Sequence, residues 1–218
     1  MEQRWARAWF ATTAVAVFIG LVIQVFVTAA VDGGHFDSKP SRVANLLFFF
    51  TIESNLIVGV TSLLLATRAD RSSTAFRVFR LTGVVAIAIT GVVYHTLLVG
   101  LYDLTAWGTA ADQLLHTAVP LLAVAGWLLF GPRGFTSGRV AAFALAFPVG
   151  WLVVTLIRGP IVDWYPYPFV DVGELGYLRV MLNVLGISVL FLAIAIGATV
   201  LDRRLALRRV VDQPATPP

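Results

Sequence analysis

Long apolar stretches alternate with short polar stretches along this chain of 218 residues. Six of the apolar stretches are long enough to cross a hydrocarbon core of about 30 Å as helices. They cover residues 8–30, 44–66, 79–101, 109–130, 140–157 and 177–200. The pattern predicts an all-α polytopic membrane bundle of six transmembrane helices. Residues 1–205 form its single domain, and residues 206–218 are expected to be a disordered cytoplasmic tail.

The composition agrees with a membrane protein. The chain is 58% hydrophobic and only 13% charged, whereas a soluble domain carries about 25% charged residues. There is no cysteine, which excludes disulfides, thiolate metal sites and a cysteine nucleophile.

The basic residues are distributed unevenly between the two sides of the predicted spans. Four flank one side, namely Lys39, Arg42, Arg158 and Arg179. Twelve flank the side that carries both termini: Arg4, Arg7, Arg68, Arg71, Arg77, Arg80, Arg133, Arg139, Arg203, Arg204, Arg208 and Arg209. The positive-inside rule therefore predicts cytoplasmic termini in a plasma or inner membrane. Because the charges flank membrane spans, we expect no nucleic-acid partner.

Polar side chains recur at one depth in the predicted helices. Five lie six or seven residues from the outer end, which is about 10 Å below the surface at 1.5 Å per residue. They are Gln24, Thr51, His95, His116 and Asn183. Polar groups in hydrocarbon face the bundle interior or a wet cavity. The pattern predicts one pocket that opens outward, and scattered hydrogen bonds between helices are the structural alternative.

The stretch FFFTIESNLIVGV, residues 48–60, carries four polar side chains within an apolar segment. Thr51, Ser54 and Asn55 have i, i+3 and i+4 spacing, so they share one helix face. Glu53 points away from that face, and its role stays open. The shared face is expected to line the predicted pocket.

The fourth span offers a base for a threonine nucleophile. Asp112 and His116 have i, i+4 spacing, so the carboxylate can orient the imidazole and leave its other nitrogen to take a proton. A threonine hydroxyl needs such a base to become a nucleophile. The sequence thus permits a hydrolase with Thr51 and His116 as its catalytic pair. Asn55, one turn below the threonine, is expected to donate to the oxyanion, and His95 is a further supporting candidate.

Two motifs resemble a known family. They are FFFTIESNL, and DQLLHTAVPLL on the fourth span. They resemble the family of the androgen-induced gene protein and the androgen-dependent TFPI-regulating protein, whose members are multi-span membrane hydrolases of fatty acid esters of hydroxy fatty acids. The matching positions are Thr51, Asn55, His116, Thr117 and Pro120. The loop DWYPYPFVDVGELGY, residues 163–177, is similar to that of bacterial members.

The resemblance implies a nucleophile at Thr51, a catalytic base at His116 and a lipid ester as substrate, with no cofactor. Asp112 departs from the amide expected in eukaryotic members. The remaining expected pocket residues are Phe48, Phe49, Phe50, Gln24 and Arg158, with the phenylalanines forming the wall for an acyl chain. Membrane lipids are the other expected partners, and the oligomeric state stays open.

Other classes of protein remain as alternatives. His95 and His116 lie at matched depth on adjacent helices, as in a b-type haem protein. Asp112 would complete three ligands for a zinc hydrolase. A transporter or a scaffold without catalytic activity is the third alternative, although the inner halves of the helices offer little polar lining.

Overall fold

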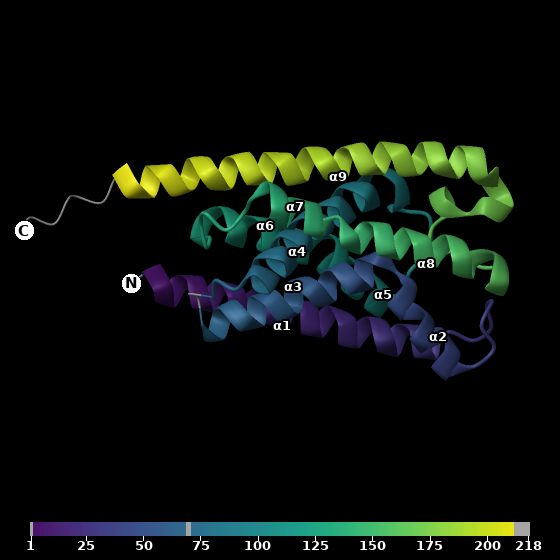
Figure 1. Cartoon of the computed structure of the whole chain (residues 1–218). Coiled ribbons are helices and arrows are strands. Elements are labelled where there is room, and N and C mark those ends of the chain that lie inside the picture. The colour runs from purple at the N-terminus through teal and green to yellow at the C-terminus, as the bar shows by residue number, and fades with distance from the viewer. Residues whose placement is uncertain (1, 69–70, 212–218) are drawn as a thin grey trace, which may run out of the picture.

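The computed structural model describes residues 2–68 and 71–211. In these ranges the chain is all-α without strands, and six helices are long and apolar enough to span a membrane. This confirms the predicted all-α, multi-pass membrane protein. The start of α1 and the end of α9 lie at the same end of the bundle (Figure 1), as an even number of crossings requires.

The described ranges contain thirteen helical elements, ten of which make up the six crossings. In chain order they are α1 (Glu2–Ala30), α2 (Lys39–Asn45), η1 (Leu46–Phe48), α3 (Phe50–Thr67), α4 (Thr74–Val93), η2 (Tyr94–Leu98), α5 (Ala106–Gln113), η3 (Leu114–Ala118), α6 (Val119–Phe130), α7 (Gly138–Ala144), α8 (Ala146–Val162), η4 (Pro168–Val170) and α9 (Val172–Val211). The crossings are α1, α3, α4 with η2, α5 with η3 and α6, α7 with α8, and α9.

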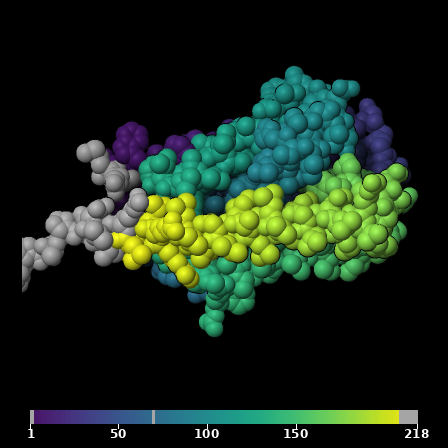
Figure 2. All heavy atoms as spheres, turned by 90° about the horizontal axis from the view of Figure 1, so that it is seen from above, coloured from purple at the N-terminus to yellow at the C-terminus, as the bar shows by residue number. Residues whose placement is uncertain are grey.

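The last helix is longer than its apolar pattern predicted. α9 continues to Val211, so residues 206–211 are helical and do not belong to a disordered tail. The rest of the predicted tail, residues 212–218, lies outside the described residues. Figure 2 shows α9 running along the whole length of one face of the molecule.

The helices α1, α3, α4 and α6 pack closely around an apolar core. Small residues allow this approach, as is common between membrane helices. A Cβ added at Gly59 would lie 2.9 Å from Val17 Cγ1, and one added at Gly83 would lie 3.0 Å from Ile57 Cγ2. These four helices form the closely packed part of the bundle against which the candidate site is built.

The fifth crossing is broken near its middle. Pro148 has no N–H to donate to the carbonyl of Ala144, so the helix cannot continue regularly through this point. Leu145 leaves the helix, and its N–H bonds to Ala142 O at 3.2 Å. α7 packs against α4, whereas α8 packs mainly against α7 and α9. The break therefore leaves space between α8 and the core.

Two side-chain contacts fasten α9 to the rest of the bundle. Near one end, the buried carboxylate of Asp202 accepts hydrogen bonds from the N–H groups of Gly134 and Thr136, at 3.1 and 3.0 Å. Near the other end, Asn183 Nδ2 donates to Phe169 O at 2.9 Å. Between these two anchors, α9 borders the space left by α8.

The sequence predicted that Arg80 flanks a membrane span in contact with water. The structure places it elsewhere. It lies inside α4 with only 4% of its surface exposed. Its guanidinium carbon is 5.1 Å from the centroid of the Phe10 ring. No hydrogen-bond partner for its three side-chain nitrogens occurs among residues 2–68 and 71–211. The third crossing thus carries a buried cation.

Candidate active site

Thr51 lies at the start of a helix that begins inside the bundle. The sequence predicted a continuous helix from residue 44, but Phe49 is extended, with φ −85° and ψ 126°. The indole Nε1 of Trp151 donates to Phe48 O at 3.0 Å. In a continuous helix, this carbonyl would instead accept from the backbone N–H four residues later. Thr51 is therefore the second residue of α3, where backbone N–H groups have no partner within the helix.

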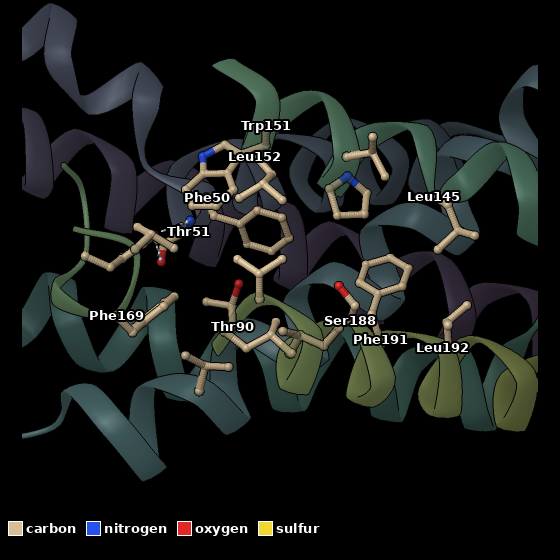
Figure 3. Close-up of a pocket in the computed structure, with 18 of the residues that line it drawn as sticks. Phe50, Thr51, Thr90, Leu145, Trp151, Leu152, Phe169, Ser188, Phe191 and Leu192 are labelled. Atoms are coloured by element: carbon tan, nitrogen blue, oxygen red, sulfur yellow. Dashed lines mark hydrogen bonds between the residues drawn. The ribbon is translucent and has the colours of Figure 1, made fainter. Parts of the chain in front are cut away.

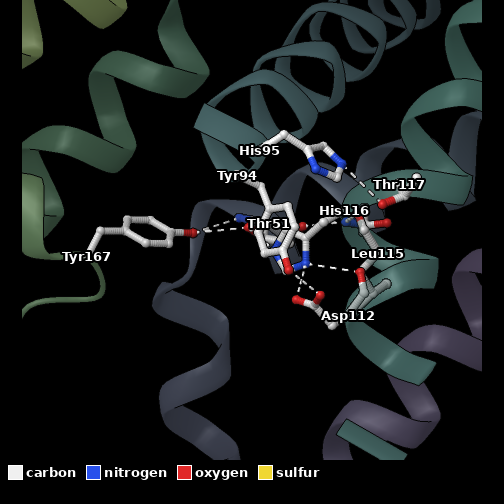
Figure 4. Close-up of polar contacts among 9 residues, drawn as sticks. Thr51, Tyr94, His95, Asp112, Leu115, His116, Thr117 and Tyr167 are labelled. Atoms are coloured by element: carbon white, nitrogen blue, oxygen red, sulfur yellow. Dashed lines mark hydrogen bonds and ion pairs between the residues drawn. The ribbon is translucent and has the colours of Figure 1, made fainter. Parts of the chain in front are cut away.

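Thr51 and His116 are in direct contact. Thr51 Oγ1 lies 3.3 Å from His116 Nε2, closer than the 5 Å or so expected before substrate binds. On the opposite side of the ring, His116 Nδ1 is 3.0 Å from Asp112 Oδ1 and 3.2 Å from Asp112 O. Figure 4 shows this chain of contacts. In the neutral tautomer whose Nδ1–H donates to Asp112, Nε2 carries no proton and can accept the threonine hydroxyl.

A π-helical turn positions His116. In η3 the N–H of Val119 bonds to Leu114 O, five residues back, and so leaves Leu115 O free. Asn55 Nδ2 donates to Leu115 O at 3.2 Å and to Thr51 O at 2.8 Å. Both amide hydrogens of Asn55 are therefore held by backbone carbonyls, and neither is free for the predicted contact with an oxyanion. Single π-helical turns often occur at functional sites.

Tyr94 contributes to the site although the sequence gave no signal for it. Its ring stacks on the imidazole of His116, with centroids 4.2 Å apart and planes 19° apart. Its hydroxyl donates to Asp112 Oδ2. Tyr94 thus fixes both the imidazole and the carboxylate, and it lies in the π-helical turn η2.

Tyr167 is the second residue that the sequence analysis missed. Its hydroxyl oxygen accepts from the Thr51 N–H at 3.1 Å and lies 3.2 Å from Thr51 Oγ1. The side chain is only 9% exposed. Burial raises the pKa of Tyr167 to about 12, although its hydrogen bonds to Thr51 act in the opposite direction. The phenol therefore keeps its proton and remains a hydrogen-bond donor at neutral pH.

The aromatic loop before α9 presents Tyr167 to the site. Its ring stacks on Phe169 with centroids 5.2 Å apart. Asn183, a predicted supporting residue, holds this loop through Phe169 O and does not reach Thr51. The Tyr-Pro repeat of the loop was the available sequence signal, but it is equally typical of residues at a membrane interface.

The other polar candidates lie around Thr51 and His116. Ser54 Oγ donates to Thr51 O at 3.0 Å and is 3.1 Å from Thr90 Oγ1. His95 is exposed, and its Nε2 lies 3.2 Å from Thr117 Oγ1. Ser54 therefore belongs to the site, whereas His95 contacts a neighbouring threonine instead.

Two residues predicted to line the pocket make their contacts elsewhere. Gln24 Nε2 donates to Thr28 Oγ1 at 3.1 Å on its own helix. Arg158 donates to Asn45 Oδ1 at 2.8 Å, and its guanidinium carbon lies 3.9 Å from the centroid of the Phe48 ring. The predicted polar layer is thus divided among separate local contacts instead of forming one pocket.

A cavity of about 290 Å³ begins at the threonine. Thr51 and Phe169 lie at one end of it, and Leu192 lies at the other (Figure 3). Among the three consecutive phenylalanines, only Phe50 lines the cavity. Phe49 packs instead against the rings of Trp164 and Tyr167. The hydroxyl of Thr51 therefore lies between an apolar cavity on one side and His116 on the other.

No family model, curated protein or solved structure matches this chain. The proposals about function therefore rest on the geometry of the site and on the short motifs within it.

The same geometry bears on the metal and haem alternatives. In the part of the chain that the structure describes, no group of three or more His, Asp or Glu side chains could hold a metal ion. The Nε2 atoms of His95 and His116 each contact a threonine hydroxyl, and Tyr94 covers one face of the His116 ring. This arrangement suits proton transfer from Thr51 better than ligation of iron.

Proposed function

We propose that this protein is a membrane hydrolase that cleaves a lipid ester with Thr51 as nucleophile and His116 as general base. The observation that carries the proposal is the unbroken series of contacts from Thr51 through His116 to Asp112 at the end of an apolar cavity. A nucleophile, a base and a group that orients the base are the components of acyl transfer. A fatty acid ester of a hydroxy fatty acid is the proposed type of substrate.

In the first half of the reaction, His116 Nε2 takes the proton of Thr51 while Oγ1 attacks the ester carbonyl. Asp112 holds the imidazolium that forms. The protonated ring then gives its proton to the departing alkoxide, so the alcohol leaves and an acyl-threonine remains. In the second half, water gives a proton to His116 and attacks the acyl group. Release of the acid returns the proton to Thr51.

Two donors are available for the oxyanion of the tetrahedral intermediate. The Thr51 N–H and the Tyr167 hydroxyl now contact each other at 3.1 Å. A carbonyl oxygen placed between them would accept from both. The N-terminus of α3 adds a favourable potential for negative charge. Donors of this kind act most strongly in a site that excludes water.

The distribution of charge supports a membrane orientation. Most of the arginines that flank the spans belong to the end of the bundle where α1 begins and α9 ends, which favours a cytoplasmic position for that end. The site then lies in the outer half of a plasma or inner membrane, within reach of lipids in the outer leaflet.

A fluorophosphonate probe tests the proposal directly. We expect the wild-type protein to be labelled, the adduct to map to Thr51 by mass spectrometry, and Thr51→Ala to remain unlabelled. Such probes trap activated hydroxyl nucleophiles, which an unactivated threonine is not. An adduct on another residue, or equal labelling of the variant, would refute the assignment of the nucleophile.

Tyr167→Phe is expected to lower kcat by about 10²–10³-fold with little change in KM, the usual effect of losing one oxyanion donor. Since its pKa is about 12, Tyr167 should cause no loss of wild-type activity between neutral pH and about pH 10. Stopped-flow or steady-state kinetics over this pH range would measure both effects. Tyr165→Phe, in the same loop but without a contact to Thr51, is the matched control. A Tyr167→Phe enzyme with wild-type kcat would show that the phenol is only structural.

A further inference from the structure

The cavity continues well beyond the atoms that the proposed reaction needs. From Thr51 it passes Phe50 and Trp151 and ends against Leu145 and Leu192. Along α9 its lining extends from Val184 to Leu192, eight residues or about 12 Å of helix. Apart from the hydroxyls of Thr90 and Ser188, the walls of this deeper part are apolar. A narrow, long and apolar space of this kind has the shape of an alkyl chain.

The deeper part of the cavity lies between α8 and α9. Val149 on α8 and Leu192 on α9 both line it and are exposed over 58% and 43% of their surfaces. Ser188, which is also exposed, lies between Thr90 and Leu192 along the cavity in Figure 3. α9 is fastened at Asp202 and at Asn183, on either side of this stretch. The gap therefore opens sideways, toward the lipid that surrounds a membrane helix.

We propose that the cavity binds one acyl chain taken directly from the bilayer through the gap between α8 and α9, and that Leu145 and Leu192 limit its length. The proposal rests on the proposed function in placing the ester carbonyl of that chain at Thr51. Leu145, at the junction of α7 and α8, lies at the inner end of the space (Figure 3).

Steric fit decides selectivity in such a site. Lipid tails are as apolar as the cavity walls, so moving a chain from the bilayer into the cavity gives no hydrophobic driving force. Packing against the walls is then the main difference between one chain and another. A chain longer than the space must either bend or leave its end in the gap, and a larger wall residue should favour shorter chains.

Ser188→Phe tests this site, because the new ring would fill the cavity at its lateral opening. We expect the ratio of palmitoyl to butyryl ester turnover to fall about tenfold or more, in line with the discrimination typical of apolar pockets. Val189→Phe is the matched control. Val189 is 59% exposed and does not line the cavity, so its variant should keep the wild-type ratio. Equal ratios in all three proteins would overturn the proposal.

A binding measurement separates this proposal from the catalytic one. Brominated palmitic acid should quench the fluorescence of Trp151 in the Thr51→Ala protein, and adding Ser188→Phe should abolish that quenching. Subtracting the signal of Trp151→Phe in the same background isolates this tryptophan from the other five. If no ester is cleaved but quenching follows this pattern, the proposed function fails and the chain site stands. If esters are cleaved but quenching is insensitive to Ser188→Phe, the chain site fails.

Discussion

Thr51→Ala is expected to lower the kcat for lipid ester hydrolysis by about 10⁴-fold or more, because the hydroxyl that forms the acyl intermediate is removed. The residual rate should reflect only binding and the remaining oxyanion donors. Thr51→Ser keeps a hydroxyl at the same place and should retain a measurable fraction of the activity. Steady-state kinetics with a chromogenic ester in detergent or nanodiscs would measure all three proteins.

Thr61→Ala is the matched control for this substitution. Thr61 lies on the same helix, is also buried, and donates to Ile57 O at 2.8 Å. Removing its hydroxyl makes the same chemical change away from the site, so kcat should stay close to the wild-type value. Full turnover by Thr51→Ala would assign Thr51 a structural role, like that of many membrane threonines that bond to their own helix.

His116→Ala is expected to have a comparable effect, about 10⁴-fold in kcat, because Thr51 then has no group to take its proton. Asp112→Asn leaves a side chain of the same shape, but it no longer holds Nδ1–H with a negative charge. It should lower kcat substantially and affect KM much less.

His95→Ala provides the contrasting variant. His95 is exposed and contacts Thr117, with no contact to Thr51. Most of the activity should therefore remain, and the pH profile should keep its shape. If His95→Ala and His116→Ala lose activity equally, the two histidines act together and the assignment of a single base is wrong.

The sequence was sufficient for the coarse fold, because six apolar segments of adequate length leave few other structures in a membrane. It also predicted that Thr51, His116 and Asp112 lie together. Polar residues inside apolar helices are easily recognised, and i, i+4 spacing shows which of them share a helix face. The sequence failed where backbone geometry departs from a regular helix. The break at Phe49 depends on Trp151, which lies more than 100 residues away and whose indole takes the carbonyl of Phe48.

The sequence analysis missed Tyr94 and Tyr167 for a related reason, since their roles depend on contacts that a helical pattern does not describe. Tyr94 was hidden because an aromatic residue in an apolar helix is ordinary, and only the contact with Asp112 distinguishes it. Tyr167 comes from a loop whose position no helical period describes. Depth along a helix also proved insufficient for Gln24 and Asn183, because matched depth does not specify the direction of a side chain around the helix axis.

The buried position of Arg80 has a consequence for how the protein is made. An arginine in a spanning helix makes insertion less favourable, by about 2.5–3.5 kcal/mol at the centre of a helix and by less at the second turn of α4, where Arg80 lies. The aromatic face that meets this guanidinium belongs to Phe10 on α1, which precedes α4 in the chain. During synthesis from the N-terminus, α1 is therefore in place before α4 leaves the ribosome. α4 then inserts beside a helix whose Phe10 ring can contact the Arg80 guanidinium. The order of synthesis therefore favours this packing of α4 against α1.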